Sequence, residues 1–161
     1  SQFGKNFGKL NRRGINIDLD NHITSTIMLS QKILKLFLKQ KHGNLILFSS
    51  IQGIAPPKFE HYYGTNMVSP IEYSAIKSAI ISITKYLAKL HKKKNIRVNC
   101  ISPGGIIYKQ PKKFVQNYLK STGNKGLLNP EDLNVAVKFL LSENSKCYNG
   151  QNLIVDDGWS L

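Results

Sequence analysis

Cysteine is scarce in this sequence of 161 residues, which contains only Cys100 and Cys147. The two lie far apart and lack the close spacing of metal ligands, so nothing indicates a disulfide framework or a metal site. We therefore expect no bound metal, and a protein of a reducing, cytoplasmic compartment.

Long apolar runs are also missing. The longest helical apolar stretch, around Ile27–Leu38, is interrupted by polar and charged residues, namely Ser30, Gln31, Lys32 and Lys35. A bilayer-spanning helix needs about 20 predominantly apolar residues. The first twenty residues have no apolar centre of the kind found in signal peptides. We expect neither a membrane span nor a secretory leader.

Acidic residues are few, nine against 23 lysines and arginines, which gives a formal net charge of +14. Such an excess raises the hypothesis of a nucleic-acid-binding domain. Only Arg12, Arg13 and Arg97 are arginine, and the lysines are scattered. The basic cluster at 91–94 falls where a helix should end, and positive charge there complements the helix dipole. We favour solvated lysines and no nucleic-acid partner, with nucleic-acid binding as the weaker alternative.

Apolar periodicity predicts one α/β domain. Helical spacing predicts helices over 20–41, 70–91 and 129–141, with a short one within 111–122. Apolar runs predict strands at 44–48, 96–101 and 152–155, and the first of these has the pattern of a strand buried on both faces of a parallel sheet. Residues 1–17 and 51–69 are predicted loops, and Asp18 or Asp20 could cap the first helix. Strands alternating with helices favour a parallel sheet with right-handed crossovers.

Tyr73 and Lys77 are four residues apart on a predicted helix and so lie on one face of it. Tyrosine is a poor acid–base catalyst at neutral pH, and a neighbouring ammonium improves it by stabilising the phenolate. A second pair, Tyr108 with Lys112, encloses Pro111 and is predicted to lie in a surface loop.

The context of the first pair strengthens it. Ser50 follows one predicted strand, and the turn Pro103-Gly104 follows the next. Ligands of open α/β sheets bind at the carboxyl ends of the strands. We therefore expect Ser50, the Tyr73–Lys77 pair and this turn to surround one crevice.

Three segments together resemble the short-chain dehydrogenase/reductase family: residues 43–53 with Ser49-Ser50 and Gly53, Tyr73-Ser74-Ala75-Ile76-Lys77, and Asn99-Cys100-Ile101-Ser102-Pro103-Gly104. The C-terminal segments 129–132, 139–142, 149–151 and 155–158 are similar as well, so the resemblance extends from about Asp20 over nearly the whole chain. It implies a Rossmann-like parallel sheet with helices on both faces, and an NAD- or NADP-dependent oxidoreductase that interconverts a secondary alcohol and a ketone.

A narrower resemblance is to the flagellin modification branch of that family, which acts on bacterial sugars. Residues 55–60, the following Tyr-Gly-Thr and Trp159 carry it. It implies a sugar or sugar-phosphate substrate and a place in the biosynthesis of surface glycans. The two long helices pair across subunits in the family, which implies a homodimer or homotetramer.

The family resemblance also implies roles for individual residues. Tyr73 donates or accepts the proton at the reacting oxygen, Lys77 binds the nicotinamide ribose, and Ser50 orients the substrate oxygen. The turn Pro103-Gly104, with the backbone of Ile106, borders the nicotinamide.

Two departures from the family pattern concern side chains at the site. Counting by the family's spacing places His22 where members have a helical asparagine that supports a proton relay. An imidazole can donate and accept and so hold the same water chain, and a purely structural histidine is the open alternative. The threonine expected after the Pro-Gly turn is absent, and Tyr108 stands near its place.

The third departure is at the N-terminus. The family begins with a strand, a Gly-rich turn and a helix that bind the pyrophosphate. Residues 3–8 contain two glycines without a preceding strand, and we interpret them as a loop. We expect residues 1–161 to be a single domain, incomplete at its N-terminus, with the Gly-rich βαβ half outside this chain. The alternative is a truncated homologue that acts as a non-catalytic binding or scaffolding protein.

The segment between Ser50 and Tyr73 is longer than the family's usual spacing. It is rich in hydrogen-bonding side chains, namely Lys58, Glu60, His61, Tyr62, Tyr63, Thr65 and Asn66. Loops at strand ends carry specificity, so we expect a polyhydroxylated substrate bound by Ser50, Gln52 and Tyr63. A surface loop without a substrate role is the alternative.

Overall fold

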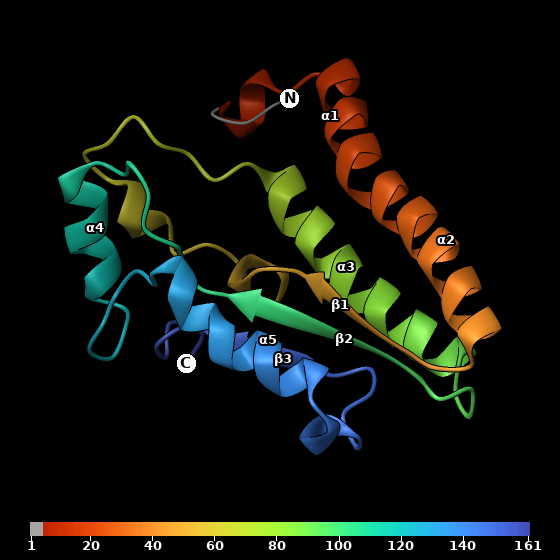
Figure 1. The fold of residues 1–161 in the computed structure, drawn as a ribbon. Helices are drawn as coiled ribbons and strands as arrows, with labels where there is room; N and C mark the ends of the chain where they lie inside the picture. The colour runs from red at the N-terminus through yellow and green to blue at the C-terminus, as the bar shows by residue number, and fades with distance from the viewer. Residues whose placement is uncertain (1–4) are drawn as a thin grey trace.

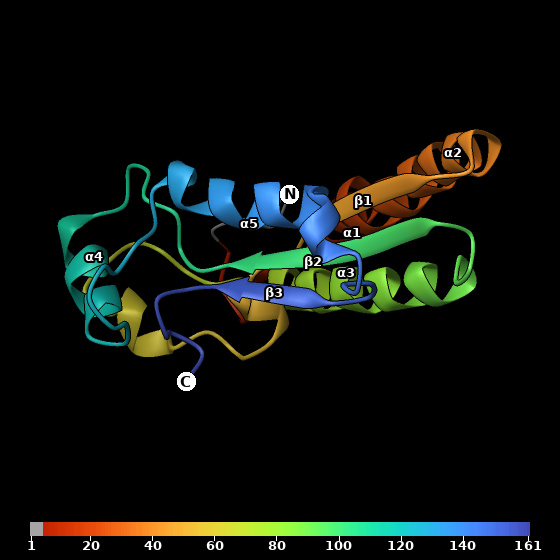
Figure 2. The ribbon, with the colours of Figure 1, turned by 60° about the horizontal axis from the view of Figure 1, so that its bottom comes forward.

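The computed structural model describes residues 5–161 and places a parallel sheet between two layers of helices (Figures 1 and 2). The regular elements are α1 (Arg12–Leu19), a π-helical turn (Asp20–Thr24), α2 (Ser25–Gln40), β1 (Gly43–Phe48), α3 (Ile71–Leu90), β2 (Ile96–Pro103), α4 (Lys112–Leu119), α5 (Asn134–Leu141) and β3 (Asn152–Val155). Short 3₁₀ turns occupy Phe7–Lys9, Ile51–Gly53, Phe59–Tyr62, Pro130–Leu133 and Glu143–Ser145.

The three strands lie in the order β1-β2-β3, and both pairings are parallel. Figure 2 shows α2 and α3 on one face of the sheet and α5 on the other. The predicted α/β fold, a Rossmann-like parallel sheet with helices on both faces, is therefore confirmed. All three predicted strands and the helix over 70–91 are present within two residues of their expected limits.

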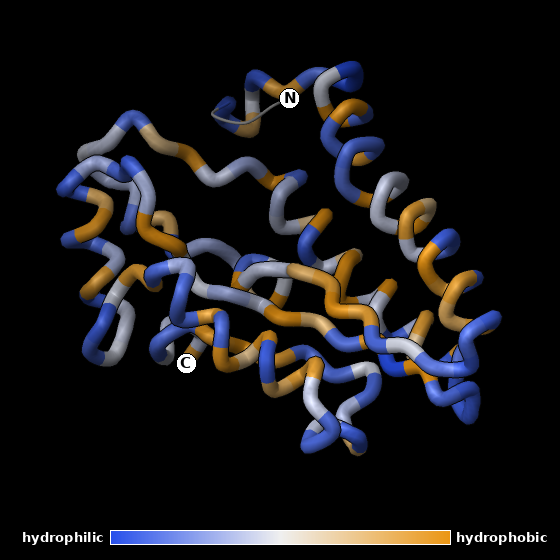
Figure 3. Tube along the Cα trace, in the orientation of Figure 1, coloured by the Kyte–Doolittle hydropathy of each residue, from blue (hydrophilic) through white to orange (hydrophobic). Residues whose placement is uncertain are grey.

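The central strand β2 supplies the core of both layers. Because strand side chains alternate, Cys100 packs with Ile76 and Ile80 of α3, whereas Ile101 packs with Ala136 and Leu140 of α5. Cys100, Ile101 and Leu140 are each 0% exposed. Figure 3 shows hydrophobic residues concentrated along the strands. None of the described helices is both long and apolar enough to span a bilayer.

The N-terminal helical region was predicted to begin too late. The helix starts at Arg12, where the Asn11 side chain accepts a hydrogen bond from the Gly14 N–H, so neither Asp18 nor Asp20 is the N-cap. The predicted loop over 1–17 is therefore wrong from residue 12 on, while residues 1–4 lie outside the described part of the chain. The π-helical turn changes the register between α1 and α2, which interrupts the helical apolar pattern in the sequence.

The prediction that the first strand is buried on both faces is wrong for this structure. β1 lies at one edge of the sheet, and only Leu45 in it is buried, while Phe48 is 45% exposed. The helix expected from residue 129 begins instead at Asn134. Residues 130–133 form a 3₁₀ turn in which the Asp132 carboxylate accepts from the Asn129 N–H.

Leu140 on α5 gives a test of this core. Leu140→Ala should lower the free energy of unfolding by about 2–5 kcal/mol, because it leaves a cavity beside Ile101. Val135 on the same helix is 77% exposed, so Val135→Ala should change it by less than about 0.5 kcal/mol. Urea denaturation of both variants measures the difference, and equal effects would contradict the packing of α5 on β2.

Candidate active site

A cleft of about 370 Å³ opens at the carboxyl ends of β1 and β2. Its walls come from these strand ends, the start of α3, the segment after β1, α4 and the C-terminal Trp159. The structure brings seven predicted site residues to this cleft, namely Ser50, Gln52, Tyr73, Lys77, Pro103, Gly104 and Ile106. The single crevice expected from the strand-end rule is therefore present.

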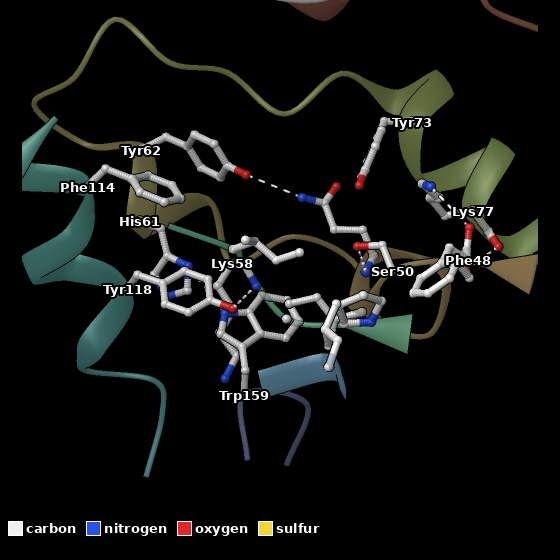
Figure 4. Close-up of a pocket in the computed structure, with 18 residues that line it drawn as sticks. Phe48, Ser50, Lys58, His61, Tyr62, Tyr73, Lys77, Phe114, Tyr118 and Trp159 are labelled. Carbon is white, nitrogen blue, oxygen red and sulfur yellow. Dashed lines mark hydrogen bonds between the residues drawn. The ribbon is translucent and has the colours of Figure 1, made fainter. Parts of the chain in front are cut away.

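The Tyr73–Lys77 pair faces the cleft from α3 (Figure 4). The Lys77 Nζ lies 5.5 Å from the centroid of the Tyr73 ring and donates a hydrogen bond to the Phe48 carbonyl at 3.3 Å. Burial of the ammonium lowers the pKa of Lys77. The i, i+4 spacing therefore places the ammonium and the phenol ring close together on one face of α3.

A close helix–strand contact sets the position of Lys77. The Ser49 hydroxyl donates to the Lys77 carbonyl at 2.7 Å, which ties α3 to the end of β1. A Cβ on Gly53 would lie 2.6 Å from the Ser49 Oγ and 2.8 Å from the Lys77 carbonyl oxygen. Only glycine therefore permits this approach.

Ser50 and Gln52 have different freedom in the cleft. The Ser50 Oγ accepts from the Gln52 N–H at 3.2 Å, which leaves its own proton to donate. The Gln52 side-chain oxygen accepts from Ser69 at 2.7 Å and from Ser74 at 3.2 Å, and its amide nitrogen donates to the Tyr62 hydroxyl at 3.3 Å. Gln52 thus connects the loop to α3, and Ser50 is the freer hydrogen-bond donor.

The far end of the cleft is an aromatic cluster of His61, Tyr62, Phe114, Tyr118 and Trp159. The Trp159 indole N–H donates to the His61 Nδ1 at 3.4 Å. Since that nitrogen accepts, the ring proton of a neutral His61 lies on Nε2, 2.9 Å from the Ser121 Oγ. Burial lowers the pKa of His61, so the imidazole is held neutral and orients the Trp159 ring.

Tyr118 connects the aromatic cluster to the turn after β2. Its hydroxyl oxygen accepts from the Gly105 N–H at 2.6 Å. Burial raises the pKa of Tyr118 to about 12, so the phenol stays protonated at neutral pH. The turn that contains Pro103 and Gly104 is thereby fixed against the cleft.

His22 lies on the other side of the Tyr73–Lys77 pair. A smaller cavity of about 90 Å³ is lined by Asp18, His22, Pro70, Glu72, Tyr73, Ile76 and Lys77. The helical position predicted for a relay residue therefore shares a cavity with Tyr73 and Lys77. In the same wall, both carboxylate oxygens of the buried Glu72 lack a hydrogen-bond partner among the described residues.

Tyr63 does not belong to the cleft, which corrects its prediction as a substrate-binding residue. It is 68% exposed, and its neighbour Tyr62 lines the cavity instead, because the turn Phe59–Tyr62 directs His61 and Tyr62 inward. Tyr108, in the second pair, is 80% exposed and precedes Pro111 in a loop, as predicted.

The sequence did not indicate that Phe114, Tyr118 and Trp159 would form one wall of the cleft. One signal was available, since Phe114 and Tyr118 are four residues apart and share a face of α4. Nothing in the sequence indicated that this face and the C-terminal tryptophan would meet. Among residues 5–161 no group of three or more metal-ligating side chains gathers in one place.

His61 gives a pH test of the aromatic cluster. Folding lowers the pKa of His61, so as pH falls the unfolded chain takes up a proton at this residue before the folded protein does. The contribution of His61 to the free energy of unfolding is therefore complete above about pH 6.5 and is lost as pH falls through the folded-state pKa. Urea unfolding from pH 7 to 5 should show a smaller loss of free energy for His61→Gln than for the unaltered chain. His42→Gln, at an exposed histidine, should keep the original slope. A slope unchanged in His61→Gln would contradict the assignment.

Comparison with known proteins agrees with this geometry. A family model described as enoyl-(acyl carrier protein) reductase matches residues 1–160. The post-translational flagellin modification protein A of Campylobacter coli is 43% identical over 98% of this chain, and the chain spans 64% of that relative's length. The 2-dehydro-3-deoxy-D-gluconate 5-dehydrogenase of Dickeya dadantii is 33% identical over 86% of the chain, which spans 53% of its length.

A solved structure of a short-chain dehydrogenase is also similar to this chain. The short-chain dehydrogenase of Leptospira borgpetersenii, with bound NAD⁺, has a TM-score of 0.90 at 35% identity and covers 99% of this chain, which spans 61% of that protein. The chain therefore belongs to the short-chain dehydrogenase/reductase family.

Proposed function

We propose that the protein to which this chain belongs is an NAD- or NADP-dependent oxidoreductase that interconverts a secondary alcohol and a ketone. One observation carries the proposal: Ser50, Tyr73 and Lys77 meet at one end of a cleft at the carboxyl ends of parallel strands (Figure 4). A hydroxyl that can donate, a phenol and a half-buried ammonium are the groups that such proton transfer needs.

The residues present fit the nicotinamide end of the cofactor. The Lys77 ammonium has three donors and uses one of them on the Phe48 carbonyl, so two remain for ribose hydroxyls. The turn containing Pro103, Gly104 and Ile106 borders the same cavity and would contact the ring. The bound cofactor would supply or accept the hydride. A Gly-rich turn between a strand and a helix does not occur before β1 in the described residues.

The residues of the chain then account for the proton. During reduction the Tyr73 hydroxyl donates its proton to the carbonyl oxygen of the substrate, while the Ser50 hydroxyl donates a hydrogen bond to the same oxygen. The Lys77 ammonium stabilises the phenolate that remains on Tyr73. During oxidation the phenolate takes the proton of the substrate alcohol, and the same contacts operate in reverse.

A sugar-like substrate agrees best with the cleft. Its walls combine aromatic rings with the hydroxyls of Ser50 and Tyr62, and such surfaces suit a ring with alternating C–H and O–H groups. The 43% identity to the C. coli protein supports a role in the post-translational modification of flagellin.

A self-associating surface is part of the proposal. α2 and α3 expose apolar residues toward solvent, namely Ile27, Met28, Leu36, Leu38, Tyr86 and Leu90. These helices would pair across subunits to form a homodimer or homotetramer, and sedimentation of the full-length protein measures the outcome directly.

Tyr73→Phe tests the chemistry. In the full-length protein this substitution should reduce the turnover of a sugar with a secondary hydroxyl group by about 100-fold or more. The variant keeps the aromatic ring and loses the transferable proton of the phenol. Tyr108→Phe removes a hydroxyl that is outside the cleft and should leave turnover unchanged. Absorbance of the reduced nicotinamide follows the reaction, and circular dichroism checks folding. Normal turnover in Tyr73→Phe would exclude Tyr73 from the mechanism. Absence of turnover in the unaltered full-length protein would instead favour the binding or scaffolding alternative.

His22 is proposed to continue the proton path from Lys77 through the small cavity behind it. His22→Asn keeps a side chain that binds water and should retain turnover within about threefold. His22→Leu cannot bind water and should lose turnover about tenfold or more while the Km for the substrate stays the same. If both variants equal the unaltered enzyme, His22 is structural and the relay role is excluded.

A further inference from the structure

The charged side chains that line the cleft are all positive. Its lining residues include two lysines, Lys58 and Lys77, and no aspartate or glutamate. The Lys77 ammonium donates a hydrogen bond to the Phe48 carbonyl, and Lys77 belongs with Ser50 and Tyr73 to the residues proposed for proton transfer. Glu60, the acidic residue nearest to Lys58 in sequence, is exposed and does not line the cavity.

Lys58 occupies the middle of the cleft. Figure 4 shows it between the reactive group of Ser50, Tyr73 and Lys77 and the aromatic cluster, above the Trp159 ring. Its Nζ lies 5.0 Å from the centroid of that ring. No salt bridge or hydrogen bond of the Lys58 ammonium is found within the described residues 5–161. The half-buried ammonium therefore has free donors that face the cavity.

The segment that carries Lys58 is held in place. The Asn117 side chain on α4 donates to the backbone carbonyls of Glu60, His61 and Tyr63 at 3.3, 3.3 and 3.2 Å. The His61 side chain, anchored between Trp159 and Ser121, is 2% exposed. The backbone and the aromatic surface beneath Lys58 are therefore positioned before any ligand binds, which reduces the entropy lost on binding.

We propose that Lys58 forms an anion subsite, so that the substrate carries a carboxylate or phosphate at a distance from the reacting carbon. This inference rests on the proposed oxidoreductase function. An ammonium in a partly desolvated cleft without a counter-charge binds an anion more strongly than one in open water. The ring of Trp159 holds the ammonium by a cation–π contact and leaves its outer N–H groups for the anion.

Calorimetric titration of the full-length protein without cofactor tests this subsite. The probes are gluconate for a carboxylate, glucose 6-phosphate for a phosphate, and glucose as the neutral comparison. At least one anionic sugar should bind saturably and more tightly than glucose, and the preferred anion identifies its source. Binding should weaken as salt is added, because the contact is electrostatic.

Lys58→Met preserves most of the side-chain length and removes the charge. It should raise the Kd of the preferred anionic sugar by at least about tenfold and leave glucose unaffected. Lys113→Met, on the exposed side of α4 and outside the cleft, makes the same change in net charge and should have no effect. Unchanged affinity in Lys58→Met, an equal loss in both variants, or no saturable binding of either anion would overturn the inference.

Tyr73→Phe separates this inference from the proposed reaction. It should bind the anionic sugar as tightly as the unaltered protein and still lose turnover. Normal turnover in Tyr73→Phe together with weak anion binding in Lys58→Met would exclude the chemistry and keep the subsite. The opposite pair of results would keep the chemistry and exclude the subsite.

Discussion

The contact between α3 and the end of β1 is the constraint on which the site depends. The Ser49 hydroxyl donates a hydrogen bond to the Lys77 carbonyl, and the Lys77 ammonium donates one to the Phe48 carbonyl. Gly53 leaves the space for α3 to approach the segment after β1. These interactions place a phenol, an ammonium and a serine hydroxyl around one point. Any residue larger than glycine at position 53 would move the helix that carries two of these three groups.

The aromatic cluster gives the cleft its second end. His61, held neutral by burial, accepts from the Trp159 indole, and Tyr118 accepts from the Gly105 N–H. Four chain segments therefore meet there: the loop after β1, the turn after β2, helix α4 and the C-terminal residues. The polar reactive end and the aromatic end are rigidly connected, with Lys58 between them (Figure 4). Under the proposed function, a substrate long enough to reach both ends would contact the protein at two separate places, and loop residues at strand ends would contribute to its specificity.

The lysines that make the chain strongly basic occupy two different environments in the structure. Most lysines lie on the exposed faces of helices and loops, as the interpretation of solvated charge predicts. Lys58 and Lys77 differ because they are half-buried in one cleft that has no acidic lining residue. A net charge of +14 also favours the approach of anions from a distance, since long-range attraction raises the rate of encounter.

The sequence by itself determined the α/β fold, the three strands and the meeting of Ser50, Tyr73 and Lys77, because strand and helix periodicities and the strand-end rule are local or topological properties. It did not determine that the first helix begins at Arg12, because the π-helical turn obscures the pattern. Only the tertiary structure decided that Tyr62 and not Tyr63 enters the cleft, and that Trp159 lies beneath Lys58. Those placements depend on the packing of segments about 100 residues apart, and such contacts have no periodicity to read.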